Sequence, residues 1–271
     1  MTPTVSPEPG TGEARGASVI VNAIAVLRCF SEEQPVLGVT EIAARVGLHK
    51  STVSRILATL EAENLVEQDP ETRRYMLGLG LIAIAGPLLA DLDVRRIAHP
   101  LLLALTERTG ETSALMLWDN NEAICVEQIP SPHKVKHTTS LGTRYCDALS
   151  ASMQVFLANQ PPERIRPLLV SGAIALPGLD DRALQDYLLR LKVAADRGYA
   201  INDGETSLDE AGAAAPVYDH RGKVVAAVLA AAPRFRVSPE ILASLGESCA
   251  ATARGITARL GAAREERALT A

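Results

Sequence analysis

The sequence predicts an α+β protein with two domains, on the basis of three observations. The chain has 271 residues, of which 47% are hydrophobic, so it is long enough for two ordinary domains and too apolar for a disordered protein. Apolar residues recur at helical spacing between residues 18 and 60. Beyond residue 112, short apolar runs separated by turn residues alternate with helical segments, which is typical of an antiparallel-rich sheet covered by helices.

The N-terminal part predicts a tail and three helices. Residues 1–16 are rich in proline and glycine and are expected to be a disordered tail. A first helix follows, a second starts after Thr40 as N-cap and stops at Gly47, and a third begins near 49–51. The positions expected to face a core are Val19, Ala23, Val26, Phe30, Ile42, Ala43, Val46, Val53, Ile56, Leu57 and Leu60.

A short hairpin is expected next. The apolar runs 65–66 and 75–77 flank Asp69-Pro70, and Asp-Pro favours a turn. Helix, helix, glycine turn, helix and hairpin together predict a winged helix-turn-helix domain over 17–78. The alternative is a small helical subdomain with no role in DNA binding.

The exposed face of the third helix favours the DNA-binding interpretation. It carries hydroxyls and cations, and its first turn lacks the acidic residues that the helix dipole would otherwise stabilise there. Hydroxyls reach phosphates and base edges, and arginine binds guanine bidentately. The residues expected to contact double-stranded DNA, including two arginines of the hairpin, are His49, Lys50, Ser51, Thr52, Ser54, Arg55, Arg73 and Arg74.

Charge and composition limit the other classes. The formal net charge is −5, which excludes a uniformly basic DNA coat, and aromatic residues make up only 3%, too few for stacking platforms that bind single strands. The four cysteines form no Cys-x-x-Cys pair, so reduced thiols without a metal or other cofactor are expected. The longest uncharged apolar stretch, 75–90, is too short to span a bilayer, and a cytoplasmic protein is expected.

The rest of the chain predicts a linker and a second domain. Residues 79–97 are expected to form a linker helix kinked near Gly86-Pro87, and residues 98–263 a domain followed by a tail, 264–271. Strands are expected at 112–118, 123–129, 135–139, 213–218 and 223–231, and helices at 100–109, 150–158, 162–171, 180–197 and 239–263. The strand 224–231 is apolar on both faces, so one face can pack on helices and the other needs a second cover or a cavity.

Two stretches of the first half, GLHKSTVSRILATL (47–60) and EQDPETRRYMLG (67–78), form a recognisable pattern with three of the second half, ERTGET (107–112), RGYA (197–200) and AAPVYD (214–219). Together these stretches resemble the IclR family of transcription regulators. The resemblance covers residues 18–262, with both halves in order. It implies a GAF-like effector-binding domain, a linker helix that dimerises the DNA-binding domains through 79–92, and often a homotetramer. A two-fold dimer in turn predicts a pseudo-palindromic operator.

The resemblance also places an effector pocket on the concave face of the sheet. Its lining is expected around 141–154, the turn 202–205 and the facing strands near 212 and 229–231. Met116 and Trp118 alternate on a neighbouring strand and are added as candidates. The expected effector-binding residues are Met116, Trp118, Tyr145, Cys146, Asp147, Ala151, Ser152, Met153, Asn202, Gly212, Leu229 and Ala231.

This pocket departs from the family pattern. A His-Ala-x-x-x-Gly-Lys pattern is replaced by YCDALSASMQ (145–154). Family serines fall on Leu229 and Ala231, an acidic position on Asn202 and a thiol position on Gly212. Fewer hydroxyl donors and a more apolar wall predict a mostly apolar, aromatic effector with one or two polar ends, either an acid or an uncharged amide or phenol.

Three functions remain open from the sequence. The first is a ligand-responsive regulator of a catabolic operon, as activator or repressor. The second is a small-molecule enzyme on the GAF-like fold, for which Cys146 with Asp147, His133 and His137 is the only nucleophile-like cluster. The third is a dimeric scaffold that does not respond to a ligand. No phosphate-binding loop, nucleophile elbow or His-Glu-x-x-His motif occurs, so a non-enzyme is expected.

Overall fold

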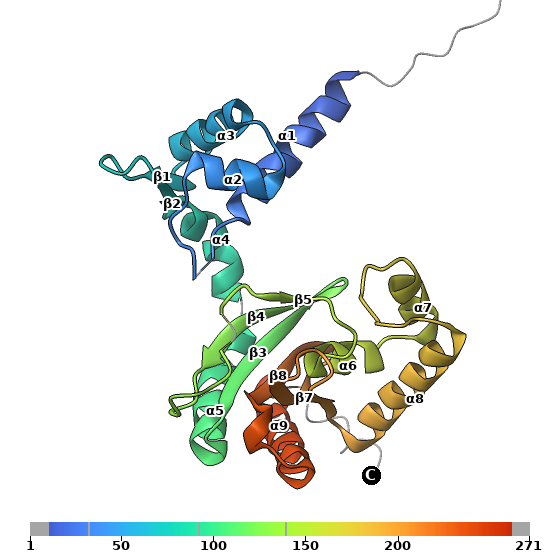
Figure 1. Cartoon of the computed structure of the whole chain (residues 1–271). Helices are drawn as coiled ribbons and strands as arrows, with labels where there is room; N and C mark the ends of the chain where they lie inside the picture. The colour runs from blue at the N-terminus through green and yellow to red at the C-terminus, as the bar shows by residue number, and fades with distance from the viewer. Residues whose placement is uncertain (1–10, 32, 92, 139, 262–271) are drawn as a thin grey trace, which may run out of the picture. The chain divides into compact units, whose positions relative to one another are not determined.

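Figure 1 shows the computed structural model, which describes residues 11–31, 33–91, 93–138 and 140–261. The chain divides into two compact units, residues 1–91 and 92–271. Each unit has its own apolar core, and the two are described in turn.

The first unit is a helical domain with a small hairpin. Its elements are α1 (Thr11–Leu27), α2 (Val39–Val46), α3 (Lys50–Ala62), β1 (Val66–Gln68), β2 (Tyr75–Leu77) and α4 (Gly80–Asp91), with β1 antiparallel to β2. Helices α1, α2 and α3 and the hairpin enclose a core of Val26, Phe30, Leu37, Ile42, Val53, Leu57, Leu60, Val66 and Tyr75. The winged helix-turn-helix arrangement expected from the sequence is therefore confirmed in its element order.

The turn between α2 and α3 depends on a glycine. Gly47 ends α2 with φ of 67°, in the left-handed region, and its N–H donates to the Ala43 carbonyl. A residue with a Cβ is disfavoured in this conformation. Gly47 thus lets the chain reverse tightly enough for α3 to pack against α2.

Two details of this unit correct the sequence predictions. Helix α1 begins at Thr11, so residues 11–16 of the expected tail are helical, and residues 1–10 lie outside the described part. The alanines and charged residues around Gly12 and Gly16 are good helix formers, which outweigh the two glycines. Thr40 is not the N-cap of α2: Gly38 is, because its N–H donates to Glu41 Oε2 at 2.7 Å and the helix starts at Val39.

The second unit is a sheet covered by helices. Among the described residues, six antiparallel strands follow the order β5-β4-β3-β8-β7-β6. Their bounds are β3 (Thr112–Asp119), β4 (Glu122–Ile129), β5 (Arg144–Tyr145), β6 (Ala200–Asp203), β7 (Glu210–Tyr218) and β8 (Val224–Pro233). The helices are α5 (Asp93–Thr109), α6 (Ala151–Ala158), α7 (Pro162–Val170), α8 (Asp181–Arg197) and α9 (Pro239–Arg259), with a short 3-10 turn at Arg234–Arg236.

The central strand β8 is buried on both faces, as its sequence predicted. Ala226, Val228 and Ala230 face the core formed with α5 and α9, which lie side by side in Figure 1. Ala227 and Leu229, of the opposite parity, face the core formed with α6 and α8. The cavity described below opens at the edge of this second layer.

Two sequence predictions fail in this unit. The expected strand at 135–139 is irregular over 135–138, because the Val135 and His137 carbonyls accept side-chain donors from Arg236 and Thr112 in place of a neighbouring strand. Residue 139 lies outside the described part. The expected linker helix 79–97 falls on α4 and the first part of α5, and residue 92 between them lies outside the described part. Helix α5 continues through Pro100, where the sequence predicted the start of a separate helix. Its continuous stripe of Val94, Ala98, Leu102 and Leu105 is buried against the sheet, which keeps one helix over this length.

Candidate nucleic-acid interface and ligand pocket

Helix α3 starts with a histidine cap. His49 Nδ1 accepts the Ser51 N–H at 3.3 Å and lies 2.8 Å from Ser51 Oγ. This bond satisfies one of the free amides of the first turn. His49 and Ser51, both predicted to contact DNA, are therefore exposed but also serve to begin the helix.

The remaining candidates on α3 form one exposed face. Lys50, Ser54 and Arg55 are exposed and Thr52 is half-buried. Within the described residues, neither Lys50 nor Arg55 has a salt-bridge partner or a hydrogen bond from its charged group. Both cations are free to meet phosphates or base edges, as a recognition helix requires.

The hairpin carries two arginines, of which only Arg74 has a side-chain partner among the described residues. Arg73 is exposed at the turn, with φ of 59°, while the Asp69 carboxylate accepts the Glu71 and Thr72 N–H groups at 2.9 and 2.8 Å and fixes that turn. Arg74, also predicted to contact DNA, has partners within its own domain. Its guanidinium forms an ion pair of 2.7 Å with Glu41 and donates to the Val36 carbonyl, so it ties the hairpin to α2.

A cavity of about 310 Å³ opens in the second unit, at one edge of the layer covered by α6. Its floor comes from β7 and β8, and its walls come from the start of α6, the end of β6 and the segments around 137 and 206. The lining residues are His137, Tyr145, Asp147, Ser150, Ala151, Ser152, Asn202, Thr206, Ser207, Glu210, Ala211, Gly212, Leu229 and Ala231. A volume of this size is in the range typical of small-molecule sites.

Most of the predicted effector residues meet at this cavity. Those that line it are Tyr145, Asp147, Ala151, Ser152, Asn202, Gly212, Leu229 and Ala231. They come from segments far apart in the chain, joined by the register that pairs Gly212 with both Asn202 and Ala231.

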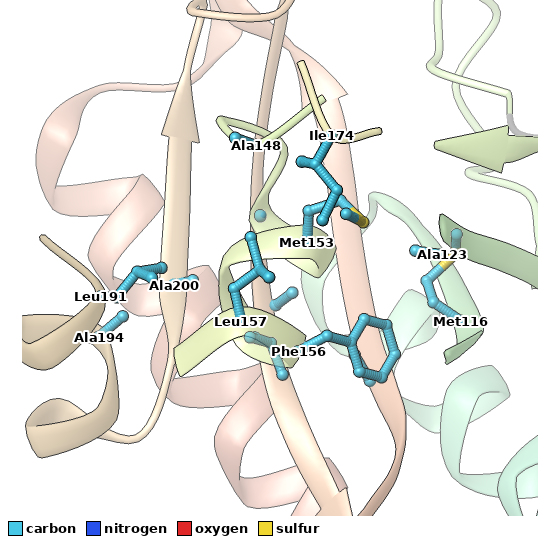
Figure 2. Close-up of a cluster of buried hydrophobic side chains, with 14 of the residues drawn as sticks. Met116, Ala123, Ala148, Met153, Phe156, Leu157, Ile174, Leu191, Ala194 and Ala200 are labelled. Carbon is cyan, nitrogen blue, oxygen red and sulfur yellow. The ribbon is translucent and has the colours of Figure 1, made fainter. Parts of the chain in front are cut away.

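Four predicted residues lie elsewhere. Met116 and Met153 are fully buried in the core between α6, α8 and the sheet, and Figure 2 shows Met153, Phe156 and Leu157 projecting from α6 within this cluster. Trp118 packs on the same core, with its ring centroid 5.2 Å from that of Phe156. Cys146 is exposed and does not line the cavity.

Met116, Met153 and Trp118 lie outside the cavity because they pack in the core. Alternation along a strand identifies which residues share a face, but α6 covers that face only in part, and the covered part is filled by the two methionines. The open part of the face begins at Leu229 and Ala231.

The sequence reasoning missed His137, Ser150, Thr206, Ser207, Glu210 and Ala211. Ser150 could have been found, because its Oγ accepts the Met153 N–H and caps α6, a position that serine favours. Glu210 and Ala211 extend β7 beyond its expected start. His137, Thr206 and Ser207 lie in irregular segments that carry no periodic signal.

The start of α6 is held rigidly beside the cavity. The Asp147 carboxylate accepts the Leu149 N–H at 2.8 Å, and the Ala148 N–H donates to the Ala175 carbonyl at 2.8 Å. The buried Tyr187 hydroxyl donates to the Ala148 carbonyl at 2.6 Å, and burial raises the pKa of Tyr187. These bonds fix where Asp147 and the first turn of α6 face the cavity.

A second network holds β6. The buried Gln154 side chain donates to the Ile201 carbonyl at 2.8 Å, and Arg190 donates to Gln154 Oε1 at 2.9 Å. Arg190 also forms an ion pair with Glu205. The Glu205 N–H in turn donates to Asn202 Oδ1 at 3.0 Å, which orients the Asn202 amide that lines the cavity.

A histidine–carboxylate pair closes one side of the cavity. His137 Nδ1 lies 3.3 Å from Glu210 Oε1, and the Thr112 hydroxyl donates to the His137 carbonyl at 2.6 Å. The hydrogen bond from His137 holds the pKa of Glu210 below its usual value. The pair joins the irregular segment around 137 to the start of β7.

The free thiols, one of which belongs to the alternative of nucleophilic catalysis, differ in their exposure. Burial raises the pKa of the Cys125 thiol to about 11 and that of Cys249 to about 12. Over the described residues, the exposed Cys146 thiol forms no hydrogen bond with a base, and His137 is engaged by Glu210. In the same part of the chain, no three His, Cys, Asp or Glu side chains gather as a metal site would need.

A DNA-binding unit joined to a unit with a small-molecule cavity defines a transcription regulator with an effector-binding domain. The comparisons agree with this class. The chain matches the model of the IclR helix-turn-helix domain over residues 19–70 and that of the bacterial transcriptional regulator IclR C-terminal domain over 87–258. The chain belongs to the IclR family.

Curated relatives match along nearly their whole length. The chain is 26% identical over 243 residues to the HTH-type transcriptional regulator XynR of Escherichia coli, covering 89% of this chain and 96% of that protein. It is 27% identical over 259 residues to the HTH-type transcriptional repressor AllR of the same species, covering 93% of this chain and 95% of that protein.

Solved structures share the fold. A regulator from Alicyclobacillus acidocaldarius is 27% identical, with a TM-score of 0.73 over 90% of this chain and 99% of that chain. An IclR homologue from Microbacterium hydrocarbonoxydans, solved as a complex with 4-hydroxybenzoate, is 22% identical, with a TM-score of 0.75 over 90% of this chain and 100% of that chain. No helix in the described residues is both long and apolar enough to cross a membrane.

Proposed function

We propose that this regulator binds a small, ring-sized and partly apolar effector in the 310 Å³ cavity, and that binding changes its affinity for an operator. We propose further that it controls genes for the catabolism of that compound and does not itself convert it. The observation that carries the proposal is the cavity, whose apolar floor faces a polar rim.

The size and lining of the cavity support a ring-sized ligand. A cavity of about 150 Å³ accommodates benzene, so 310 Å³ leaves room for a ring with polar substituents. Ala151, Leu229 and Ala231 offer carbon surface for a ring, and Ser152 and Asn202 offer hydrogen bonds to a substituent. The Microbacterium homologue, which shares the fold, was solved with an aromatic ligand of this size.

The DNA-binding half of the proposal rests on the face of α3. Lys50, Ser54 and Arg55 would enter the major groove, and Arg73 of the hairpin would contact the backbone or minor groove. One such domain touches few bases, so two copies acting on a pseudo-palindromic operator would supply the needed specificity.

Helix α4 and the residue before it support a homodimer. Leu79, Ile82 and Ile84 are 79%, 61% and 68% exposed, a concentration of apolar surface that a second copy would cover. Sedimentation at micromolar concentration is expected to show a dimer or a tetramer, and a monomer would contradict this part of the proposal.

A titration of the protein–operator complex tests the effector. Benzoate-type acids, their amides and short keto acids are added while DNA binding is followed by fluorescence anisotropy. Ring compounds are expected to change operator affinity, and Leu229→Ser is expected to weaken that response because it places a hydroxyl in the apolar floor. Leu189→Ser, on the exposed face of α8, is the matched control.

Two outcomes would contradict the proposal. One is a response to the keto acids alone, since these lack the ring that the floor is proposed to hold. The other is an unchanged response in Leu229→Ser.

A further inference from the structure

The charges around the cavity constrain the chemistry of the effector, if the proposed function is correct. Among the described residues, the ionisable acids and bases that line it are Asp147, Glu210 and His137, and neither lysine nor arginine is present. Two residues with carboxylates thus line the cavity, and its single imidazole lies 3.3 Å from one of these carboxylates.

Two arginines on the surrounding elements are bound to other acids. Arg190 of α8 pairs with Glu205, and one of its N–O distances is 2.7 Å. Arg234, after β8, pairs with Asp203 at 2.9 Å. None of these four residues lines the cavity. A negatively charged effector would gain Arg190 or Arg234 as a partner only by breaking one of these pairs.

The N-terminus of α6 does not compensate for this. Its positive dipole end favours an anion, but the Asp147 carboxylate already lies at that end, where it accepts the Leu149 N–H. The Ser150 hydroxyl accepts the Met153 N–H of the first turn. Part of the helix end is therefore occupied by the protein's own acceptors.

We propose that the effector presents a hydrogen-bond donor to Asp147 and Glu210, such as an amide, amidine or phenol group, and that a carboxylate is selected against. A carboxylate would be a third negative charge in a partly buried site, where charges repel more strongly than in water. A donor group instead receives two carboxylate acceptors, and hydrogen bonds to ionised acceptors are the strong ones. This inference deepens the proposed function, on which it rests, by naming the polar end of the effector.

Three probes of nearly the same shape separate charge from size: benzamidine, benzamide and benzoate, with charges of +1, 0 and −1. Their affinities for the full-length protein are measured at pH 7 by calorimetry. Benzamidine and benzamide are expected to bind, and benzoate to bind at least about tenfold more weakly. Equal or tighter binding of benzoate would overturn the inference while leaving a ring-sized site intact.

Two isosteric variants assign the effect to the two carboxylates. The ratio of the benzamidine affinity to the benzoate affinity is expected to fall by about threefold or more in Glu210→Gln and in Asp147→Asn. This ratio is called the affinity gap. Glu163→Gln, which removes the same charge from the exposed face of α7, is expected to leave the affinity gap unchanged.

Folding of each variant is checked by thermal unfolding. If Asp147→Asn does not fold because its turn is lost, Glu210→Gln and the wild-type probe series still decide the question. An affinity gap that persists in full in a folded Glu210→Gln variant would exclude the role given to that residue. If none of the three probes binds, the proposed ring-sized site is contradicted, and this inference with it.

Discussion

Arg55 provides the sharpest test of how this protein would recognise DNA. Its residue is exposed and, among the described residues, its guanidinium forms no ion pair or hydrogen bond within its own domain. Its side chain also borders a shallow groove formed with Val19 and Asn22 of α1. The two possible roles of Arg55, reading a base and covering this groove, can be separated by comparing Arg55→Ala with Arg55→Met, which keeps the aliphatic stem.

The expected magnitudes follow from these contacts. An arginine bound bidentately to guanine contributes about 1–3 kcal/mol, so Arg55→Ala should weaken specific binding by roughly 5–150-fold per half-site and relax specificity at one position. Both Arg55 variants should leave the free energy of unfolding within about 0.5 kcal/mol of the wild type, as an exposed side chain without partners predicts. Arg74→Ala should instead lower the free energy of unfolding. Its pair with Glu41 is exposed and contributes up to about 1 kcal/mol of stability.

The assay is fluorescence anisotropy with operator variants at several salt concentrations, together with thermal unfolding of each protein. Loss of affinity in both Arg55→Ala and Arg55→Met assigns the effect to the guanidinium. Loss in Arg55→Ala alone assigns it to the stem. Lys50→Ala should weaken binding to all sequences and reduce the salt slope by about 0.9. An affinity and footprint unchanged by the Arg55 and Lys50 substitutions would refute the assignment of α3 as the recognition helix.

Three further predictions concern stability. Gly47→Ala should destabilise the first unit by about 1–2 kcal/mol, measured by denaturant unfolding, because alanine is strained at φ of 67°, and a loss below about 0.3 kcal/mol would contradict this. The nearly buried carboxylate of Glu111 binds Arg236 through two N–O contacts of 2.7 Å, so Glu111→Gln should lower the free energy of unfolding of the second unit by roughly 1–3 kcal/mol. An unchanged melting temperature would exclude that contribution. His137 keeps the pKa of Glu210 below its usual 4.5, so the pair stabilises the fold above that pH and this contribution is lost as the pH falls below it. Glu210→Gln should therefore lose less stability on acidification than the wild type. An acid unfolding transition identical to that of the wild type would argue against the pair.

Local patterns in the sequence determined the first unit and much of the sheet. The helical spacing of Val53, Ile56, Leu57 and Leu60 placed the buried face of α3 correctly, which left Lys50 and Arg55 on the opposite face. Alternation along β8 likewise separated its two buried faces. Such patterns are readable because burial along one element repeats with the geometry of that element. They do not state which partner covers each face.

Only the tertiary structure decided where the cavity lies and what charges it carries. Met116 and Met153 shared the apolar character expected of a pocket, but Met116 of β3 and Met153 of α6 are both fully buried and fill the core. His137 and Glu210 meet across segments far apart in the chain, and Arg74 is held by Glu41 of another element. The physical reason is the same in each case. A cavity remains where the side chains of neighbouring elements do not fill the space between them, and an ion pair forms where two elements approach each other. Both depend on the relative positions of elements, which no local spacing encodes.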